Sequence, residues 1–197
     1  MREAKKDLIV LGLSDALLTR EDLLATGKLS SASAARILSK YSSVLPECCF
    51  PMAAIVPLEL TFDDEGVCLN GEKFGNGHVA SLLTGHGAAY LYYVTCGAQL
   101  ESAECFGSSS MRDVFAFAAL LKITETMNEW FRDELKMSEA TNLFTEAGRE
   151  LTQEDLELLT RLGTAAREYL GIRIDSRGLM RPWNTLRGLM YEKALNL

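Results

Sequence analysis

The sequence predicts an α+β protein, and three observations carry that prediction. Residues 88–94 form an unbroken apolar and aromatic run with glycine on both sides, which favours a strand buried on both faces over a helix. A long amphipathic helix is predicted to begin near Ser110. Asn70-Gly71, which follows an alternating segment at 67–69, predicts a two-residue hairpin turn, because both positions tolerate positive φ. We expect the remaining elements to pack on the buried strand and its helix.

The composition is that of a globular protein without a nucleic-acid or membrane surface. Of the 197 residues, 48% are apolar and 24% are charged, and the formal net charge is −7. Nucleic acids and anionic lipids need clustered Lys and Arg, and Lys5-Lys6 is the one lysine pair. No apolar run approaches the ~20 residues of a membrane span, and the N-terminus lacks a signal-peptide cleavage site. We expect a cytoplasmic protein of one domain, 1–197, with an N-terminal helical segment at 1–49 and a core at 50–191.

Residues 8–46 are predicted to be helical. Thr19 and Asp22 have the spacing of a capping box at a helix start. A second helix is predicted to start in the serine-rich cluster 30–33 and to stop before Pro46.

An antiparallel meander is predicted next. Pro57 favours the edge or the end of a strand, because proline has no N–H to donate to a neighbour. Residues 58–62 and 67–69 alternate apolar and polar side chains around a turn at 63–66.

The long central helix is predicted over residues 110–137. Ser110 lies three residues before Asp113, which is the spacing of a helix-start signal. One apolar stripe at helical spacing is expected to face the core. It consists of Phe117, Leu120, Leu121, Thr124, Met127, Phe131 and Leu135.

A second long helix is predicted to begin at the capping box of Thr152 and Asp155 and to end at Gly171. Residues 172–175 then read as a strand, followed by a turn. Residues 186–191 are expected on a strand or a short helix.

The turn Thr95-Cys96-Gly97 is the first candidate binding site. Loops at strand ends often bind ligands, and glycine allows close approach to the backbone. Cys96 could also be an activated thiol, although packing is the favoured interpretation. The five cysteines are odd in number and lack a C-x-x-C motif, which indicates mostly buried, reduced thiols.

Four arginines at 173, 177, 181 and 187 form the second candidate, because guanidinium groups bind carboxylate or phosphate in a bidentate manner. The alternative is surface pairing with the carboxylates of this acidic protein. Other features favour structural roles. They are the acid-rich loop 139–154, the glycines near His78 and His86, and Trp130 and Trp183, which are expected in the core or at an interface.

The order of these elements and several short motifs resemble the activation (reactivation) domain of cobalamin-dependent methionine synthase. The chain is most similar to the small stand-alone proteins related to that domain, over roughly residues 50–191. The matching pieces are 74–83, the Thr-Cys-Gly-Ala-Gln-Leu-Glu run at 95–101, Asp113 with its helix, Leu170-Gly171-Ile172, the segment 176–182 and Asn184-Thr185-Leu186-Arg187-Gly188.

The resemblance implies a twisted antiparallel β-sheet flanked by helices. In the full enzyme this domain binds S-adenosylmethionine and docks on the cobalamin domain, where it supports reductive methylation of inactive cob(II)alamin. The electron comes from a separate reductase. This chain departs from the family at the S-adenosylmethionine motif, which is Arg, three residues, then Gly-Tyr. Asn142 stands in place of the arginine, and Glu146-Ala147 replace Gly-Tyr.

The leading hypothesis is an accessory protein of a cobalamin-dependent methionine synthase (methyltransferase) system. Its partner would be a cobalamin-binding methyltransferase module, and cobalamin would be met only through that partner. The docking surface would involve the Thr95–Gly97 turn and the 180–185 segment. The candidate cofactor-binding residues are Thr95, Cys96, Gly97, Arg177, Met180 and Arg181, with no catalytic or metal-binding residue assigned. The alternatives are a diverged protein that binds a nucleoside or corrinoid without catalysis, and a thiol enzyme that uses Cys96.

Overall fold

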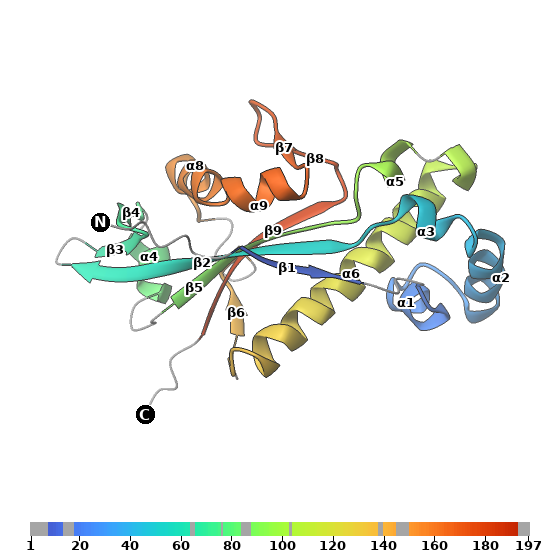
Figure 1. Ribbon diagram of the computed structural model, residues 1–197, viewed down its shortest axis with the longest axis horizontal. Coiled ribbons are helices and arrows are strands. Elements are labelled where there is room, and N and C mark those ends of the chain that lie inside the picture. The colour runs from blue at the N-terminus through green and yellow to red at the C-terminus, as the bar shows by residue number, and fades with distance from the viewer. Residues whose placement is uncertain are drawn as a thin grey trace.

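The structure is a computed structural model that describes residues 8–13, 18–63, 66–75, 77–83, 88–102, 104–137, 140–144 and 150–192. Within this part, an antiparallel sheet carries helices on both faces (Figure 1). The strands are β1 (Ile9–Gly12), β2 (Met52–Asp63), β3 (Gly66–Leu69), β4 (Glu72–Lys73), β5 (Ala88–Thr95), β6 (Ala140–Asn142), β7 (Arg173–Ile174), β8 (Met180–Arg181) and β9 (Thr185–Glu192). The helices are α1 (Arg20–Ala25), α2 (Ser31–Tyr41), α3 (Leu45–Cys48), α4 (Gly77–Leu83), α5 (Gln99–Ser102), α6 (Ser109–Asp133), α8 (Gln153–Leu162) and α9 (Thr164–Tyr169), with a 3-10 turn at Glu104–Phe106.

The main sheet has the order β4-β3-β2-β5-β9-β6, with β1 also paired to β2, and β7 and β8 form a separate hairpin. Every pairing within the described residues is antiparallel. The predicted hairpin at Asn70-Gly71 is confirmed, with φ of 53° and 81° at the two residues between β3 and β4. The meander and the α+β class are therefore as the sequence predicts.

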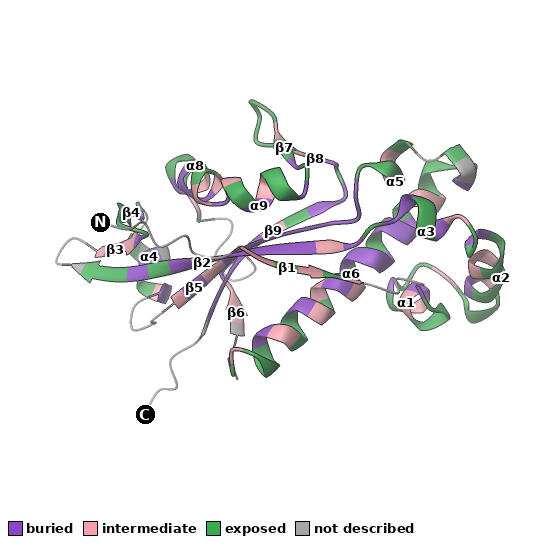
Figure 2. Cartoon of the chain, viewed as in Figure 1, coloured by how far each residue is buried: buried purple, intermediate pink, exposed green. Residues whose placement is uncertain are grey.

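Strand β5 lies between β2 and β9 and is buried on both faces, as its apolar run predicts. Tyr92 and Val94 belong to the core that packs against α6. Leu91 and Tyr93 belong to a second core that packs against α8 and α9 on the opposite face. Figure 2 shows the buried residues continuing through the neighbouring parts of β2 and β9. The alternation of side chains along one strand thus divides the protein into two cores.

Helix α6 is confirmed in place, but its start and its buried face differ from the prediction. Ser108, and not Ser110, is the N-cap, and its side chain accepts from Met111 N. Phe117 and Leu121 from the predicted stripe are 41% and 38% exposed, whereas the members at 120, 127 and 131 are buried. The helix approaches the core through small alanine side chains at 116, 118 and 119, which rotates the buried face away from Phe117.

The prediction that all of residues 8–46 are helical is wrong for β1. Residues 9–12 instead pair with β2, from Ile9 opposite Ile55 to Gly12 opposite Met52. A short apolar segment can form either element, and the open side of β2 decides between them. The capping box at Thr19 is confirmed, as is the start of α2, which Ser30 caps.

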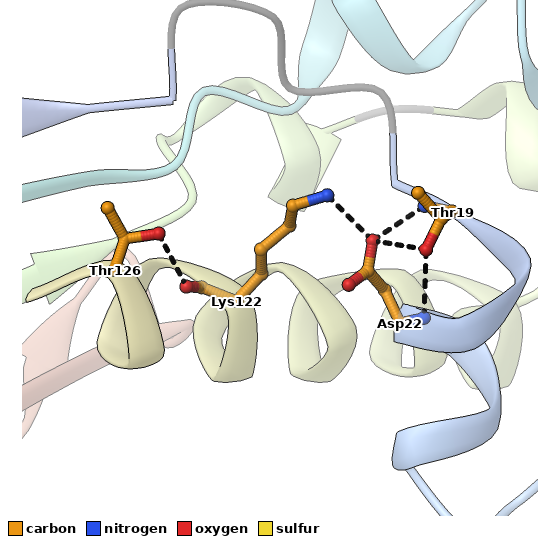
Figure 3. A network of polar contacts seen from close by, with 4 residues as sticks. All are labelled: Thr19, Asp22, Lys122 and Thr126. Carbon is orange, nitrogen blue, oxygen red and sulfur yellow. Dashed lines mark hydrogen bonds and ion pairs between the residues drawn. The ribbon is translucent and has the colours of Figure 1, made fainter. Parts of the chain in front are cut away.

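A partly exposed polar network ties α1 to α6. Lys122 Nζ on α6 lies 2.8 Å from Asp22 Oδ2 on α1, and Thr19 N and Oγ1 donate to the same oxygen (Figure 3). Although burial raises it, the hydrogen bonds from Lys122 and Thr19 hold the pKa of Asp22 below its usual value.

Two prolines lie inside elements at positions where no backbone N–H is needed. Pro57 lies within β2 and not at its end, opposite Tyr90 of β5. On the other side of β2, the pairing with β1 reaches only as far as Ile55, and the pairing with β3 starts at Leu60 of β2. Pro57 therefore occupies a local edge where no N–H is needed. Pro46 lies in the first turn of α3, where proline is tolerated, and α2 has already ended.

The predicted C-terminal helix is two helices, α8 and α9, which meet at Gly163. A Cβ at Gly163 would lie 2.5 Å from Tyr93 Cε2 and 3.0 Å from Leu91 Cδ2, so the chain approaches the sheet closely here. The strand at 172–175 is confirmed as β7, and the C-terminal segment is the strand β9.

Candidate functional site

The predicted Thr95–Gly97 turn and the segment before β9 meet at one end of the sheet, which we call the strand-end junction (Thr95, Cys96, Gly97, Asn184 and Thr185). Thr95 is directly opposite Thr185 in the β5–β9 pair. Thr95 Oγ1 accepts from Thr185 Oγ1 and from Gly97 N, at 3.2 Å in each case. Asn184 Nδ2 donates to Gly97 O at 3.4 Å, and Cys96 N donates to Asn184 O at 3.4 Å. The sequence correctly groups these segments.

The junction is buried, so its three predicted binding residues do not present side chains to a ligand. Thr95 and Cys96 are 0% exposed, and Gly97 is buried against Phe50. Cys96 Sγ donates to Ala116 O of α6 at 3.4 Å. Its hydrogen bond with Cys49 and its burial raise the pKa of the Cys96 thiol well above the usual value. The favoured interpretation of Cys96 as a packing residue agrees with this geometry, and an activated thiol does not.

Exposed apolar side chains surround the junction and form what we call the junction rim (Phe50, Trp183 and Leu186). They are 41%, 41% and 45% exposed. Phe50 N donates to Cys96 O at 2.8 Å, Trp183 N donates to the Glu101 carboxylate, and Leu186 is opposite Val94. Each rim residue is therefore held by backbone contacts at the same end of the sheet.

The four arginines predicted as an anion site do not act together. Arg173 and Arg181 are exposed and lie opposite each other in the β7–β8 hairpin. Arg177 lies in the turn of this hairpin, and Arg187 lies half-buried in β9. Met180, the remaining candidate, packs against the core on the α8–α9 face. Arg177 and Arg187 line a common cavity, whereas Arg173, Arg181 and Met180 are not among its lining residues.

This cavity, which we call the arginine cavity, has a volume of about 610 Å³. It lies between α8, the end of α9, the β7–β8 hairpin and β9, on the upper side of the sheet in Figure 1. Its lining residues are Gln153, Leu156, Glu157, Thr160, Arg161, Arg167, Ile174, Asp175, Ser176, Arg177, Gly178 and Arg187. The sequence does not identify Arg161 and Arg167 as candidate binding residues, because polar residues on one predicted helix are expected to face solvent.

The inner wall of the cavity is built around Thr160. Arg187 Nη1 donates to Thr160 Oγ1 at 3.0 Å, and Arg167 Nη2 donates to Thr160 O at 3.3 Å and to Thr164 Oγ1 at 3.2 Å. The Arg187 guanidinium lies 5.2 Å from the centre of the Phe144 ring. Behind them, burial raises the pKa of Tyr93, and the nearby charges of Arg187 and Arg167 oppose that shift.

Asn142 occupies the position where the family resemblance places an arginine, and its side chain is already engaged. Its Nδ2 donates to Tyr92 Oη at 2.7 Å, and its Oδ1 accepts from Phe144 N at 3.0 Å. Burial raises the pKa of Tyr92 to about 12, which the bond from Asn142 partly opposes. Asn142 thus links β6 to β5 and has no cationic group to offer a carboxylate. The Glu146-Ala147 part of the motif lies outside the described residues.

The acid-rich loop 139–154 is described in part, since residue 139 and residues 145–149 lie outside the described residues. Asp155, which follows it, is 1% exposed. Its Oδ2 accepts from Thr152 N and Oγ1, which confirms the predicted capping box, and its Oδ1 accepts from Gly75 N at 2.8 Å. This carboxylate joins α8 to the segment before α4.

Other predicted features have mixed outcomes. Trp130 is half-buried, with its ring 5.4 Å from that of Phe131, whereas Trp183 is exposed. The side chain of His78, and all of His86, lie outside the described residues. In the part of the chain that is described, no three His, Cys, Asp or Glu side chains gather as a metal site would require. None of the helices there combines the length and the apolar character needed to cross a membrane.

Comparison with known proteins places the fold. No protein-family model and no curated protein sequence matches this chain. Among solved structures, it is similar to the MetH reactivation domain bound to AdoHcy, with 13% sequence identity and a TM-score of 0.56. The match covers 95% of this chain and 78% of the other. At this identity the likeness establishes the fold alone, and this is the fold that the sequence resemblance implies.

Proposed function

We propose that this chain is an accessory protein of corrinoid-dependent methyl transfer. It would dock on a separately encoded, cobalamin-binding methyltransferase and support the reductive reactivation of that enzyme. The observation that carries the proposal is the likeness to the MetH reactivation domain, which extends over 95% of the chain. The buried strand-end junction leaves its predicted binding residues inaccessible to a small ligand. Binding of a partner protein at the exposed residues beside it is compatible with that burial.

The junction rim is the surface proposed for docking. Phe50, Trp183 and Leu186 expose apolar area around a buried and hydrogen-bonded base. Exposed aromatic side chains on a rigid base are typical anchors of protein interfaces, because little conformational entropy is lost when they bind. The cobalamin-binding partner would bury these side chains when the two proteins associate.

The test is a pull-down of a cobalamin-loaded methyltransferase from the same genome, with and without reductant. Trp183→Ala should lower retention by at least ~10-fold, as expected for the loss of a central aromatic anchor. Tyr169→Ala is the matched control, because Tyr169 on α9 is a more exposed aromatic residue, at 57%, and lies outside the rim. No retention of the partner by the wild-type protein under either condition would remove the proposal.

A second candidate function is the binding of an adenosyl ligand, and the AdoHcy in the structural neighbour favours it. Because Asn142 replaces the motif arginine and bonds to Tyr92, a ligand with an amino-acid carboxylate would lack its cationic partner at this position. Thermal shift measurements with S-adenosylmethionine, AdoHcy and a corrinoid separate the two functions. A rise in melting temperature of several degrees with either nucleoside supports this second candidate, and no change excludes it.

A further inference from the structure

We propose that the arginine cavity binds a small ligand that carries a phosphate group. The proposal concerns the face of the sheet covered by α8 and α9 and does not use the junction rim, so it is independent of the docking function. It rests on the charge of the cavity wall, on the finding that no described carboxylate forms an ion pair with its inner arginines, and on its size.

The cavity wall is positively charged in an otherwise acidic protein. Four arginines line it, at positions 161, 167, 177 and 187, against two carboxylates, Glu157 and Asp175. The wall therefore has a net charge of +2, whereas the whole chain has −7. A concave positive wall concentrates field lines and attracts anions, even when the protein as a whole is negative.

The two carboxylates of the wall contact groups other than the inner arginines, Arg167 and Arg187. Asp175 Oδ1 accepts from Arg177 N and Leu179 N at 2.9 and 3.0 Å, and its Oδ2 lies 3.4 Å from Arg177 Nη2. Glu157 accepts from Gln153 Nε2 at 3.0 Å. At the outer edge, Arg161 forms an exposed ion pair with Glu72 across 2.5 Å, which water and salt screen. Among the described residues, these acids form no ion pair with Arg167 or Arg187.

Arg167 and Arg187 are two half-buried cations that share one neutral residue, Thr160. Neither forms an ion pair with any carboxylate among the described residues. The Nε atom of each is buried without a hydrogen-bond partner in the described part of the chain. Two like charges held side by side destabilise each other, and buried donors without acceptors also cost free energy. A dianion between them would offset both costs.

Phosphate fits this wall better than a single carboxylate does. The hydrogen bonds to Thr160 use Arg167 Nη2 and Arg187 Nη1, and guanidinium groups bind phosphate oxygens in a bidentate manner. A phosphate monoester carries two negative charges and three terminal oxygens, enough to contact two arginines at once. The volume of about 610 Å³ lies in the range of small-molecule sites and leaves room for an organic group beyond the phosphate.

The experiment is isothermal titration of the full chain with a panel of anions in low-salt buffer. Pyrophosphate and inorganic phosphate test the bare charge, and adenosine monophosphate and ribose 5-phosphate test the organic group. Citrate is the carboxylate arm, and acetate is the monoanion. Binding of the phosphate compounds that is at least ~10-fold tighter than that of acetate, and that weakens with added salt, supports the proposal. No phosphate compound binding at millimolar concentration overturns it, as does citrate binding more tightly than every phosphate compound.

Two substitutions place the ligand in the cavity. Arg187→Gln should weaken phosphate binding by at least ~10-fold, because a charge-assisted hydrogen bond is lost. Arg177→Gln tests the mouth of the cavity and should weaken binding by about 3-fold, and since Arg177 is 76% exposed this variant should fold normally. Arg132→Gln, at an exposed position at the end of α6, is the control and should bind like the wild type. Equal affinity in the wild type and both cavity variants would overturn the proposal.

Discussion

The strand-end junction and the arginine cavity both include residues of β9, but the junction is buried and uncharged whereas the cavity is open and lined by arginines. At the junction, the hydroxyls of Thr95 and Thr185 bond to each other inside the protein, and both residues are buried. Two residues further along, Arg187 points a charged group into a cavity where no described carboxylate pairs with it. Burial closes the junction to ligands, and within it Asn184 Oδ1 is also buried without a hydrogen-bond partner among the described residues. The cavity is the region where a ligand would still lower the free energy.

The largest expected effect concerns the close contact that holds the cavity wall to the sheet. Gly163→Ala should lower the free energy of unfolding by about 2–3 kcal/mol, because its Cβ would lie 2.5 Å from Tyr93 Cε2, and Tyr93 is fully buried and has no room to move. Gly12→Ala in β1 is the matched control, since its Cβ would meet nothing within 4 Å. Urea unfolding measures both. Equal stability of the two variants would mean that α8 and α9 are not held tightly on the sheet.

The next effect tests whether the junction is a structural unit. Thr95→Val keeps the shape of the side chain but leaves Gly97 N and the Thr185 hydroxyl without their acceptor, so a loss of about 2 kcal/mol is expected. Thr61→Val is the control, because Thr61 is exposed in β2, and its loss should stay below about 0.5 kcal/mol. If Thr95→Val is as stable as the wild type, the junction polar atoms are free to serve a ligand after all.

The two regions also differ in how far the sequence reveals them. The junction follows from local signals: the apolar run of β5, Gly97 after it, and the order of elements that brings Asn184 alongside. The arginine cavity depends on packing over long sequence distances. Arg161 and Arg167 lie on helices whose exposed and inward-facing polar residues look alike in sequence, and only the β7–β8 hairpin makes them part of a wall.

The same reasoning explains the successes and failures elsewhere in the fold. Capping boxes at Thr19 and Thr152 are local hydrogen-bond patterns, and both are confirmed. The sequence predicts helix where the structure has β1. A four-residue apolar segment can form either element, and pairing with the open side of β2 makes this one a strand. The break at Gly163 depends on a contact with Tyr93, which lies on a strand distant in sequence. The spacing of apolar residues along the helix cannot reveal such a contact.

The ion pair of Asp22 with Lys122 shows how much stability a paired charge contributes, for comparison with the arginines of the cavity. Asp22→Asn should lower the free energy of unfolding by about 1 kcal/mol at pH 7, because it removes the carboxylate that Lys122 and Thr19 contact. Since the folded pKa of Asp22 lies below its unfolded value of about 3.9, this contribution is present above pH ~4 and is lost as the pH falls through the folded pKa. The difference between the variant and the wild type should therefore shrink at pH 3. Asp113→Asn, at an exposed position, is the control, and a difference that does not change with pH would contradict the assignment.

The smallest expected effect is the sharpest test of the comparison. Removing a polar group at the junction should cost about 2 kcal/mol of stability, whereas removing the Arg187 charge from the cavity should cost almost none. Arg187→Met should leave the free energy of unfolding within about 0.5 kcal/mol of the wild type, or above it, in buffer without phosphate. The methionine keeps the apolar stem of the side chain, and its neutral end no longer repels Arg167 beside Thr160.

The measurement is urea unfolding at low salt, repeated with added pyrophosphate. The wild type should gain stability with pyrophosphate, because a ligand that binds the folded state shifts the unfolding equilibrium, and the variant should not. A loss above about 1.5 kcal/mol without ligand would show that the contacts of Arg187 with Thr160 and Phe144 are what hold β9 to α8. In that case Arg187, like Thr95 at the junction, would have a structural role, and the contrast between the two regions would disappear.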